Sequence, residues 1–239
     1  GLLVGVEHSL ELAGPSGAAV LDMDRQCAIG LTRSDDDLAS PVLDRVLDQV
    51  GERLLQAQLM ALRWQELAPE RIEIVLSDFG SSPEQAESVD RLAETYGARV
   101  VRTRTRSMWN RSLALNLGIR ASRGEVVLCT DADMIFAPSF APVILDEHGA
   151  SQQELLVICR CLDLPESVET RVWDREDFDD LRARAALRHA KGTGACQAAR
   201  RSFFFAVHGY DQKYRRWGKE DMDMLRRARL SGLQPRWIH

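Results

Sequence analysis

The sequence has no apolar run near the roughly 18 residues that a membrane span requires, and no signal-peptide pattern opens it. Positive charge is not in excess either. The formal net charge is -5, so the chain has no general attraction for nucleic acid or an anionic membrane. We therefore expect no nucleic-acid partner and no integral membrane segment, and any phosphate binding must come from local groups or a metal.

The number of cysteines is odd, and their spacing suggests no pairing. The five cysteines include no C-x-x-C pair, and Cys129 lies inside an apolar run, where a small core residue is more common than a thiol nucleophile. This usage favours a reducing, cytoplasmic setting. The chain begins with Gly1 rather than Met, which is typical of a trimmed product or of part of a longer chain.

Short apolar runs alternate with helical patterns along most of the chain. Strands are predicted at residues 28–31, 72–76, 99–102 and 155–159, and helices at residues 41–68, 83–96, 108–119, 176–190 and 220–232. The early order of strand, helix, strand, helix, strand predicts an α/β fold whose mostly parallel sheet is covered on both faces. Residues 1–26 are harder to interpret, and their two apolar runs around a turn signal indicate a hairpin or an irregular cover.

Two carboxylates follow an apolar run at residues 126–130. If Asp131 and Asp133 lie at the carboxyl end of a buried strand, they stand where open α/β sheets bind ligands. Residues two apart on a strand point to the same side, so both carboxylates could face one hard cation or a cluster of hydroxyls. Solvated or loop-capping aspartates are the alternative, and this short motif does not decide between the two.

A second acidic pair opens the last predicted helix. Asp221 is followed at helical spacing by Met224, Leu225 and Ala228, which places a carboxylate at the head of a buried stripe. It could simply complement the helix dipole, or it could act as a general base in a partly dehydrated pocket. In the helix predicted at residues 108–119, Arg111 stands in the first turn, where a cation is unfavourable unless an anion is near; a solvated surface arginine is the alternative.

Five segments, in order, resemble the motifs of nucleotide-sugar glycosyltransferases of the GT-A fold. They are Ser77-Asp78-Phe79-Gly80-Ser81, Trp109-Asn110-Arg111-Ser112 with Asn116-Leu117-Gly118, Asp131-Ala132-Asp133, Gly209-Tyr210-Asp211, and Trp217-Gly218-Lys219-Glu220-Asp221-Met222-Asp223. The first is similar to the D-D-G-S of family 2, and the third matches D-x-D. The others are similar to F-N-R-A with N-x-G, G-[FY]-[DP] and W-G-G-E-D-x-[DE] of β-1,4-galactosyltransferases. Phe79 departs from the pattern where an acid is usual, and Lys219 departs where a glycine is usual.

The resemblance implies a Rossmann-like αβα sandwich with a mixed, mostly parallel central sheet. It implies a single domain over residues 1–239, with a nucleotide-binding half at 27–136 and an acceptor-binding, catalytic half at 137–239. The implied activity is metal-dependent transfer of a sugar, most simply from a UDP-sugar, to a saccharide or other acceptor hydroxyl. GDP-mannose stays open as a donor, and retaining enzymes share a similar C-terminal region.

The resemblance also implies roles for individual residues. Thr32, Arg33 and Asp78 would line the base and ribose, and Arg111 would approach the base or the diphosphate. Asp131 would lie near the ribose or a metal-bound water. Trp217 and Gly218 would face the donor and acceptor sugars. Asp221 would be the general base of an inverting reaction, with Glu220 holding a neighbouring sugar hydroxyl.

The implied cofactor is Mn²⁺ or Mg²⁺, with Asp133 as the direct ligand and Asp131 beside it. His239 stands where related enzymes often supply a histidine ligand, although it is also the terminal residue. Two other classes fit parts of the sequence. A relative that binds nucleotide-sugar without turnover fits the Phe79 and Lys219 departures, and a haloacid-dehalogenase-type phosphatase fits Asp22-Met23-Asp24 after an apolar run.

Overall fold

The structure is a computed structural model that describes residues 2–8, 41–107, 109–188, 195–215 and 218–238, with side chains from residue 51 onward. Its centre is one sheet with the order β3-β2-β1-β4-β8-β5-β9. These strands are β1 (Leu2–His8), β2 (Ile72–Phe79), β3 (Arg99–Thr103), β4 (Val126–Asp131), β5 (Leu155–Cys159), β8 (Cys196–Arg200) and β9 (Gln234–Ile238). The predicted strand at residues 28–31 lies outside the described residues.

The sheet is mixed and mostly parallel, as predicted. Strands β3, β2, β1 and β4 run parallel, β8 is antiparallel to both of its neighbours β4 and β5, and β9 runs parallel to β5. The expectation of a hairpin or irregular cover in residues 1–26 is wrong for its first part, because Leu2–His8 is a central strand. Leu2 pairs with Ile72 on one side and with Val126 on the other.

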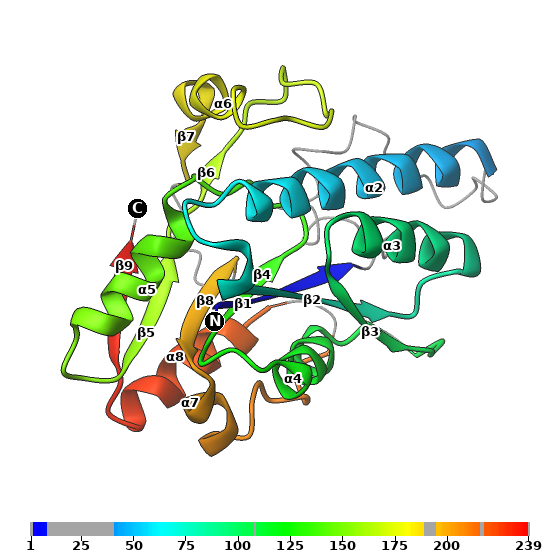
Figure 1. Cartoon of the computed structure of the whole chain (residues 1–239). Helices are drawn as coiled ribbons and strands as arrows, with labels where there is room; N and C mark the ends of the chain where they lie inside the picture. Colours follow the sequence, from blue (N-terminus) through cyan, green and yellow to red (C-terminus); the bar gives the residue numbers. More distant parts are fainter. Residues whose placement is uncertain (1, 9–40, 108, 189–194, 216–217, 239) are drawn as a thin grey trace.

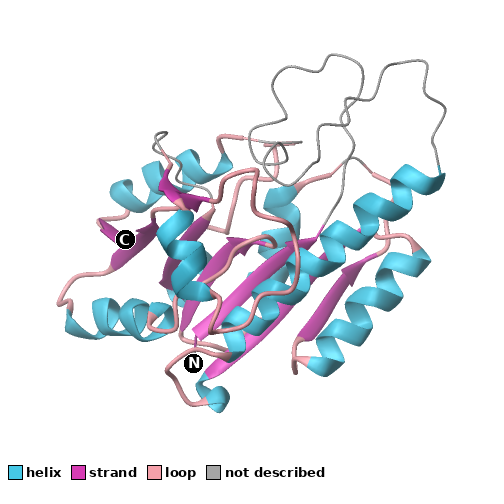
Figure 2. Cartoon of the chain, turned by 90° about the horizontal axis from the view of Figure 1, so that it is seen from above, coloured by secondary structure: helices cyan, strands magenta, loops and turns pink. Residues whose placement is uncertain are grey.

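Helices cover both faces of the sheet (Figures 1 and 2). They are α2 (Pro41–Arg63), α3 (Pro83–Thr95), α4 (Arg111–Ala121), α5 (Phe140–Ala150), α7 (Arg201–Ala206) and α8 (Glu220–Leu230). One core packs α2, α3 and α5 against the sheet, and a second core packs α4, α7 and α8 against the opposite face. The structure is therefore the αβα sandwich that the sequence predicts. Within the described ranges, no helix is long and apolar enough to cross a bilayer.

Helix α2 ends at Arg63, five residues before the predicted end at residue 68. The next side chains bond to the loop that leads into α5 instead of continuing the helix. Trp64 Nε1 donates to the carbonyl of Phe136 at 2.9 Å, and Gln65 Nε2 donates to that of Ala137 at 2.8 Å. A short 3-10 helix, Pro69–Arg71, then leads into β2.

The predicted charged helix at residues 176–190 is shorter than expected. Helix α6 covers only Phe178–Arg184, and the chain then pairs β7 (Ala186–Leu187) with β6 (Leu162–Asp163). Arg188 holds this two-stranded sheet together, because its Nε and Nη2 both donate to Asp163 Oδ1, at 2.8 and 2.5 Å. Helical charge spacing alone does not reveal such a pairing with a segment 25 residues away.

Candidate active site

Strand alternation decides which layer of helices meets Asp131, the last residue of β4. Val126 and Leu128 pack into the core beneath α2 and α3, whereas Val127 and Cys129 pack into the core beneath α4 and α8. Side chains alternate along a strand, so Asp131 shares the face of Val127 and Cys129. Its carboxylate therefore leaves the sheet on the side of α4 and α8.

Arg111, the first residue of α4, binds two acidic side chains at once. Its Nε and Nη2 donate to Asp131 Oδ1 at 3.2 and 2.7 Å, and its Nη1 donates to Glu220 Oε1 at 3.2 Å. The arginine side chain is only 8% exposed, and those of Asp131 and Glu220 are 16% and 6% exposed. The alternative of a solvated surface arginine is therefore wrong, because carboxylates of the protein itself compensate the cation.

The start of α8 differs in detail from the predicted buried stripe. Met224 is buried as expected, but the buried acid is Glu220, at 4% exposure, whereas Asp221 is partly exposed. The helix begins directly at Glu220, whose side chain turns inward to reach Arg111. Lys219 precedes it with φ of 78°, a left-handed conformation that side chains rarely adopt.

Gln197 is a buried polar residue of the site that the sequence did not reveal. It lies on β8 at 1% exposure, and its Nε2 donates to the backbone carbonyl of Asp221 at 3.0 Å. Its Oε1 accepts a hydrogen bond from the hydroxyl of Tyr210 at 2.9 Å. The available signal was a polar residue between the small apolar residues Cys196 and Ala198. Gln197 ties the first turn of α8 to the sheet.

Two of the sequence motifs meet at Asn116 and Gly209. The side chain of Asn116 on α4 donates from Nδ2 to the carbonyl of Tyr210 at 2.8 Å, and its Oδ1 accepts from the Tyr210 amide at 2.7 Å. Gly209 has φ of 71°, and a Cβ there would stand 2.1 Å from Asn116 Oδ1. Only glycine fits at this position, because both the conformation and the contact exclude a side chain.

Replacing Gly209 with Ala should lower the free energy of unfolding by about 2–3 kcal/mol, because it breaks both Asn116 bonds and adds left-handed strain. Chemical denaturation of the two proteins measures this difference. Gly149→Ala is the matched control, since nothing lies within 4 Å of a Cβ added there. Equal stability of Gly209→Ala and the native chain would contradict the packing described here.

Asp78, near the end of β2, leaves the sheet on the opposite face from Asp131. It is 1% exposed, and both of its oxygens accept hydrogen bonds. Ser81 Oγ donates to Oδ1 at 2.5 Å, and Arg102 Nε donates to Oδ2 at 2.6 Å. Arg102 also holds Asp90 on α3, and this hydrogen bond lowers the pKa of the Asp90 carboxyl. The Asp78 carboxylate is thus fixed by the loop that follows β2 and by Arg102 of β3.

Asp133 does not continue the strand that carries Asp131. Strand β4 ends at Asp131, and residues 132–133 form a turn, so the expected same-side placement by strand alternation does not apply. Asp133 is exposed. Arg188, which follows β7, lies close enough to feel this charge. The hydrogen bond to Asp163 is the main cause that raises the pKa of the Arg188 guanidinium, and the charge of Asp133 raises it further. The β6-β7 sheet therefore lies near the end of β4, where Asp131 and Asp133 stand.

The half-buried thiol of Cys161 lies near the same rim. Burial raises the pKa of Cys161 to about 12, and the charges of Asp131 and Asp133 act in the same direction. Cys129 is 2% exposed in the core, as predicted. The raised pKa of Cys161 and the burial of Cys129 are the opposite of what activates a cysteine nucleophile.

The carboxylates at the rim fit a hard divalent cation. Within the described residues, no three His, Cys, Asp or Glu side chains converge on one point. Mg²⁺ and similar ions are commonly held by one or two carboxylates while substrate phosphates supply further oxygens, so a complete protein cage is not required. Asp133 has an exposed carboxylate suited to this role, and Arg111 engages Oδ1 of Asp131.

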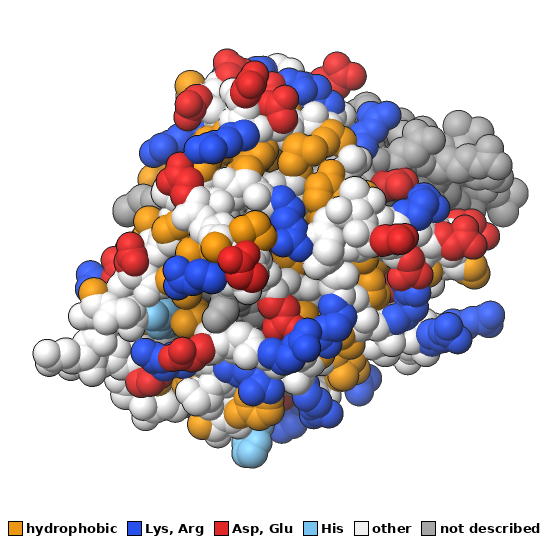
Figure 3. Space-filling model, viewed as in Figure 1, with side chains coloured by type: hydrophobic (Ala, Val, Ile, Leu, Met, Phe, Trp, Pro, Cys, Tyr) orange, Lys and Arg blue, Asp and Glu red, His pale blue; other side chains and the backbone are white. Residues whose placement is uncertain are grey.

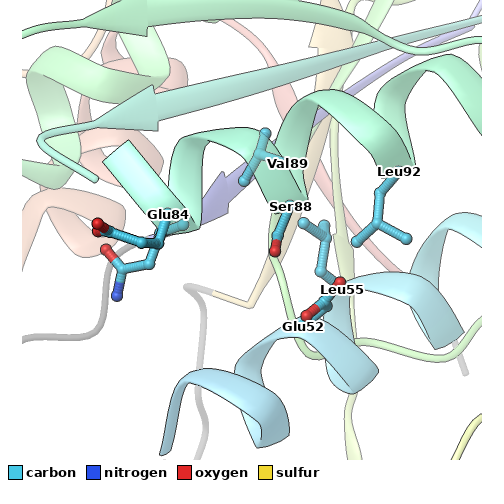
Figure 4. A pocket seen from close by; sticks show the side chains of 7 residues that line it. Glu52, Leu55, Glu84, Ser88, Val89 and Leu92 are labelled. Carbon is cyan, nitrogen blue, oxygen red and sulfur yellow. The ribbon is translucent and has the colours of Figure 1, made fainter. Parts of the chain in front are cut away.

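Two hollows lie outside this rim. A cavity of about 370 Å³ is bordered by the loop after α7 and by Asp223 and Arg227 of α8. A smaller one of about 70 Å³ lies between α2 and α3, with Glu52, Glu84 and Leu55 among its walls (Figure 4). Positive and negative side chains are interspersed over the face drawn in Figure 3, which suits a chain of small net charge.

Four predicted site residues, Thr32, Arg33, Trp217 and His239, lie outside the described residues. Gly218, beside Trp217, has φ of 102°, a conformation suited to glycine. Of the remaining predicted residues, the structure brings Arg111, Asp131 and Glu220 together. Asp221 follows Glu220 in the first turn of α8.

Comparisons with known proteins identify the family and the fold. Residues 41–207 match the model of glycosyl transferase family 2. No curated protein matches the sequence. Similar solved structures include the mannosyltransferase PcManGT from Pyrobaculum calidifontis in complex with GDP-Man and Mn²⁺, with a TM-score of 0.54 and 18% identity, over 99% of this chain and 54% of that one.

A second similar structure is S. aureus TarS 1-349, with a TM-score of 0.59 and 13% identity over 99% of this chain and 57% of that one. Its complex with UDP-GlcNAc gives a TM-score of 0.57 and 13% identity over 99% and 55%. The chain thus spans little more than half the length of these structures. The dehalogenase alternative depended on Asp22 and Asp24, which lie outside the described residues, and the family match gives it no support. The motifs, the sheet and the family model lead to one conclusion: the chain belongs to glycosyl transferase family 2 and has the GT-A fold.

Proposed function

We propose that this chain transfers a sugar from a nucleotide-sugar donor, most simply a UDP-sugar, to an acceptor hydroxyl with the help of a divalent metal ion. The observation that carries the proposal is the ion-pair network in which Arg111 joins Asp131 at the end of β4 to Glu220 at the start of α8. It unites the D-x-D and E-D motifs at the carboxyl end of β4, where ligands of open α/β sheets bind.

In the proposed reaction, the acceptor oxygen attacks the anomeric carbon from the face opposite the leaving group. Asp221 accepts the proton of the acceptor hydroxyl as the new C–O bond forms. The bond between the anomeric carbon and the diphosphate oxygen breaks, and its electron pair leaves with the nucleoside diphosphate. Direct displacement of this kind inverts the configuration. The partial exposure of Asp221 supports its access to a substrate.

Bound Mn²⁺ or Mg²⁺ would neutralise the charge that develops on the departing diphosphate. Asp133 would hold the ion, with His239 as a further proposed ligand, while Asp131 lies beside it. Thr32 and Arg33 are proposed to contact the base and ribose. Asp78 is proposed to join them once Ser81 or Arg102 releases one of its oxygens, because it is only 1% exposed. Trp217 and Gly218 are proposed to face the sugars, since an indole suits the apolar face of a pyranose.

Titration calorimetry with UDP and with GDP, each with and without Mn²⁺, tests the proposal. We expect manganese-dependent binding of UDP and weaker binding of GDP. PcManGT was solved with GDP-Man and TarS with UDP-GlcNAc, so preference for GDP would change the donor and keep the reaction class. Failure of both nucleotides to bind would refute the proposal.

A further inference from the structure

Helix α8 begins without a side-chain N-cap. Its N-cap residue, Lys219, has the left-handed φ of 78° and makes no side-chain capping bond. Capping side chains normally satisfy the first amides and fix where a helix starts. Contacts from other elements must therefore set the position of the first turn, which carries Glu220 and Asp221.

Two such contacts come from two different elements, β8 and α4. Gln197 on β8 donates to the carbonyl of Asp221 at 3.0 Å, and Arg111 on α4 donates to the carboxylate of Glu220 at 3.2 Å. The Arg111 contact restricts the position of the turn more than the Gln197 contact does. It is a buried ion pair, and the same guanidinium group also binds Asp131. A buried charge with a fixed fork geometry orients its partners more strictly than an exposed pair does.

Arg111 is itself held rigidly at the start of α4. The preceding Asn110 caps this helix by accepting from the Leu113 amide at 2.9 Å, and its Nδ2 donates to the carbonyl of Gln212 at 3.0 Å. The guanidinium thus extends from a capped helix end that is also tied to the loop after α7. Its two carboxylate partners lie 20 and 109 residues away in the sequence.

We propose that Arg111 is a positioning residue that fixes the base-bearing turn of α8 relative to the end of β4. It acts through the first acid of each motif, Asp131 and Glu220, and so sets where the second acids, Asp133 and Asp221, meet the donor and the acceptor. This inference depends on the proposed function and differs from the role implied by resemblance, in which the arginine contacts the base or the diphosphate.

The kinetic test uses Arg111→Lys, which keeps the charge but loses the fork that binds both acids. We expect kcat to fall roughly a hundredfold, because displacement of a reacting group by about 1 Å has effects of that size, while the donor KM changes less than about fivefold. Arg99→Lys is the matched control, since Arg99 donates to Glu73 at 2.8 Å beside the start of β3. A large rise in donor KM at unchanged kcat would overturn the proposal and assign Arg111 to the diphosphate.

Coupling between the two residues adds a second test. Glu220→Gln weakens the same contact from the other side, so the double variant with Arg111→Lys should have a kcat no more than about threefold below that of the worse single variant. If the loss of kcat in the double variant equals the product of the two single losses, the two residues act independently, and this result would overturn the proposal.

Hydrogen exchange supplies a measurement that needs no turnover. In Arg111→Lys, the amides of residues 223–226, the first in α8 with a helical hydrogen bond, should exchange at least about tenfold faster, whereas Arg99→Lys should leave them unchanged. Unchanged exchange at the start of α8 would overturn the positioning role even if the chain is an active transferase. Faster exchange in a protein that binds no nucleotide would instead keep the positioning role and refute the proposed function.

Discussion

Replacing Asp221 with Asn is expected to lower kcat by about 10³-fold, within the range that removal of a general base produces. The amide has the same shape as the carboxylate but cannot accept the proton of the acceptor hydroxyl. The hydrogen bond from Gln197 to the Asp221 carbonyl uses the backbone of Asp221, so the substitution leaves this bond in place. Nucleotide affinity should therefore change less than about threefold, and steady-state kinetics with calorimetry measures both quantities.

Asp223→Asn is the matched control for this experiment. Asp223 lies two residues further along α8 and accepts from Arg227 Nε at 2.7 Å. Its replacement should reduce stability more than activity, because it weakens a partly buried ion pair away from the proposed chemistry. If Asp221→Asn keeps near-normal transfer while Asp133→Ala abolishes it, the proposed base is wrong and a retaining mechanism is favoured.

Replacing Asp133 with Ala is expected to remove the metal dependence of nucleotide binding and to lower kcat/KM by roughly 10³-fold. A divalent ion contributes several kcal/mol to stabilising charge on a leaving phosphate, and Asp133 is its proposed ligand. Titration of the variant with UDP should give equally weak binding with and without Mn²⁺. Wild-type affinity that still depends on Mn²⁺ would assign the ion to other residues.

Asp146→Ala provides the control for loss of one exposed carboxylate. Asp146 lies on α5, is exposed, and belongs to none of the motifs. Its replacement should leave both the manganese dependence and the kinetics within about twofold of the native chain, as is usual for surface substitutions.

Periodicity predicted the parts of the site that lie within single elements. The apolar run before Asp131 is strand β4, and a helix lies where one was expected over residues 108–119, starting at Arg111. Alternation also decides the face on which Asp131 leaves the sheet, although the partner on that face depends on how α4 and α8 pack. Burial of Arg111 could not be predicted, because it depends on two acids that are distant in sequence.

Three errors have identifiable physical causes. The strand Leu2–His8 contains Gly5 and ends in polar residues, so its local pattern did not distinguish a central strand from an irregular cover. The 3.6-residue pattern of α8 placed Asp221 on the buried stripe, whereas the ion pair with Arg111 buries Glu220. Gln197 was missed because its partners, the Asp221 carbonyl and the Tyr210 hydroxyl, come together only in the folded chain.

The measurement that tests the account most directly is release of nucleoside diphosphate by the purified chain from a panel of UDP-sugars and GDP-mannose. Each donor is supplied with Mn²⁺ and with saccharide acceptors, before and after the metal is removed with a chelator. The account predicts that one nucleotide class is cleaved and that chelation stops the reaction. Cleavage of no donor, together with no binding of UDP or GDP in the presence of Mn²⁺, would contradict it.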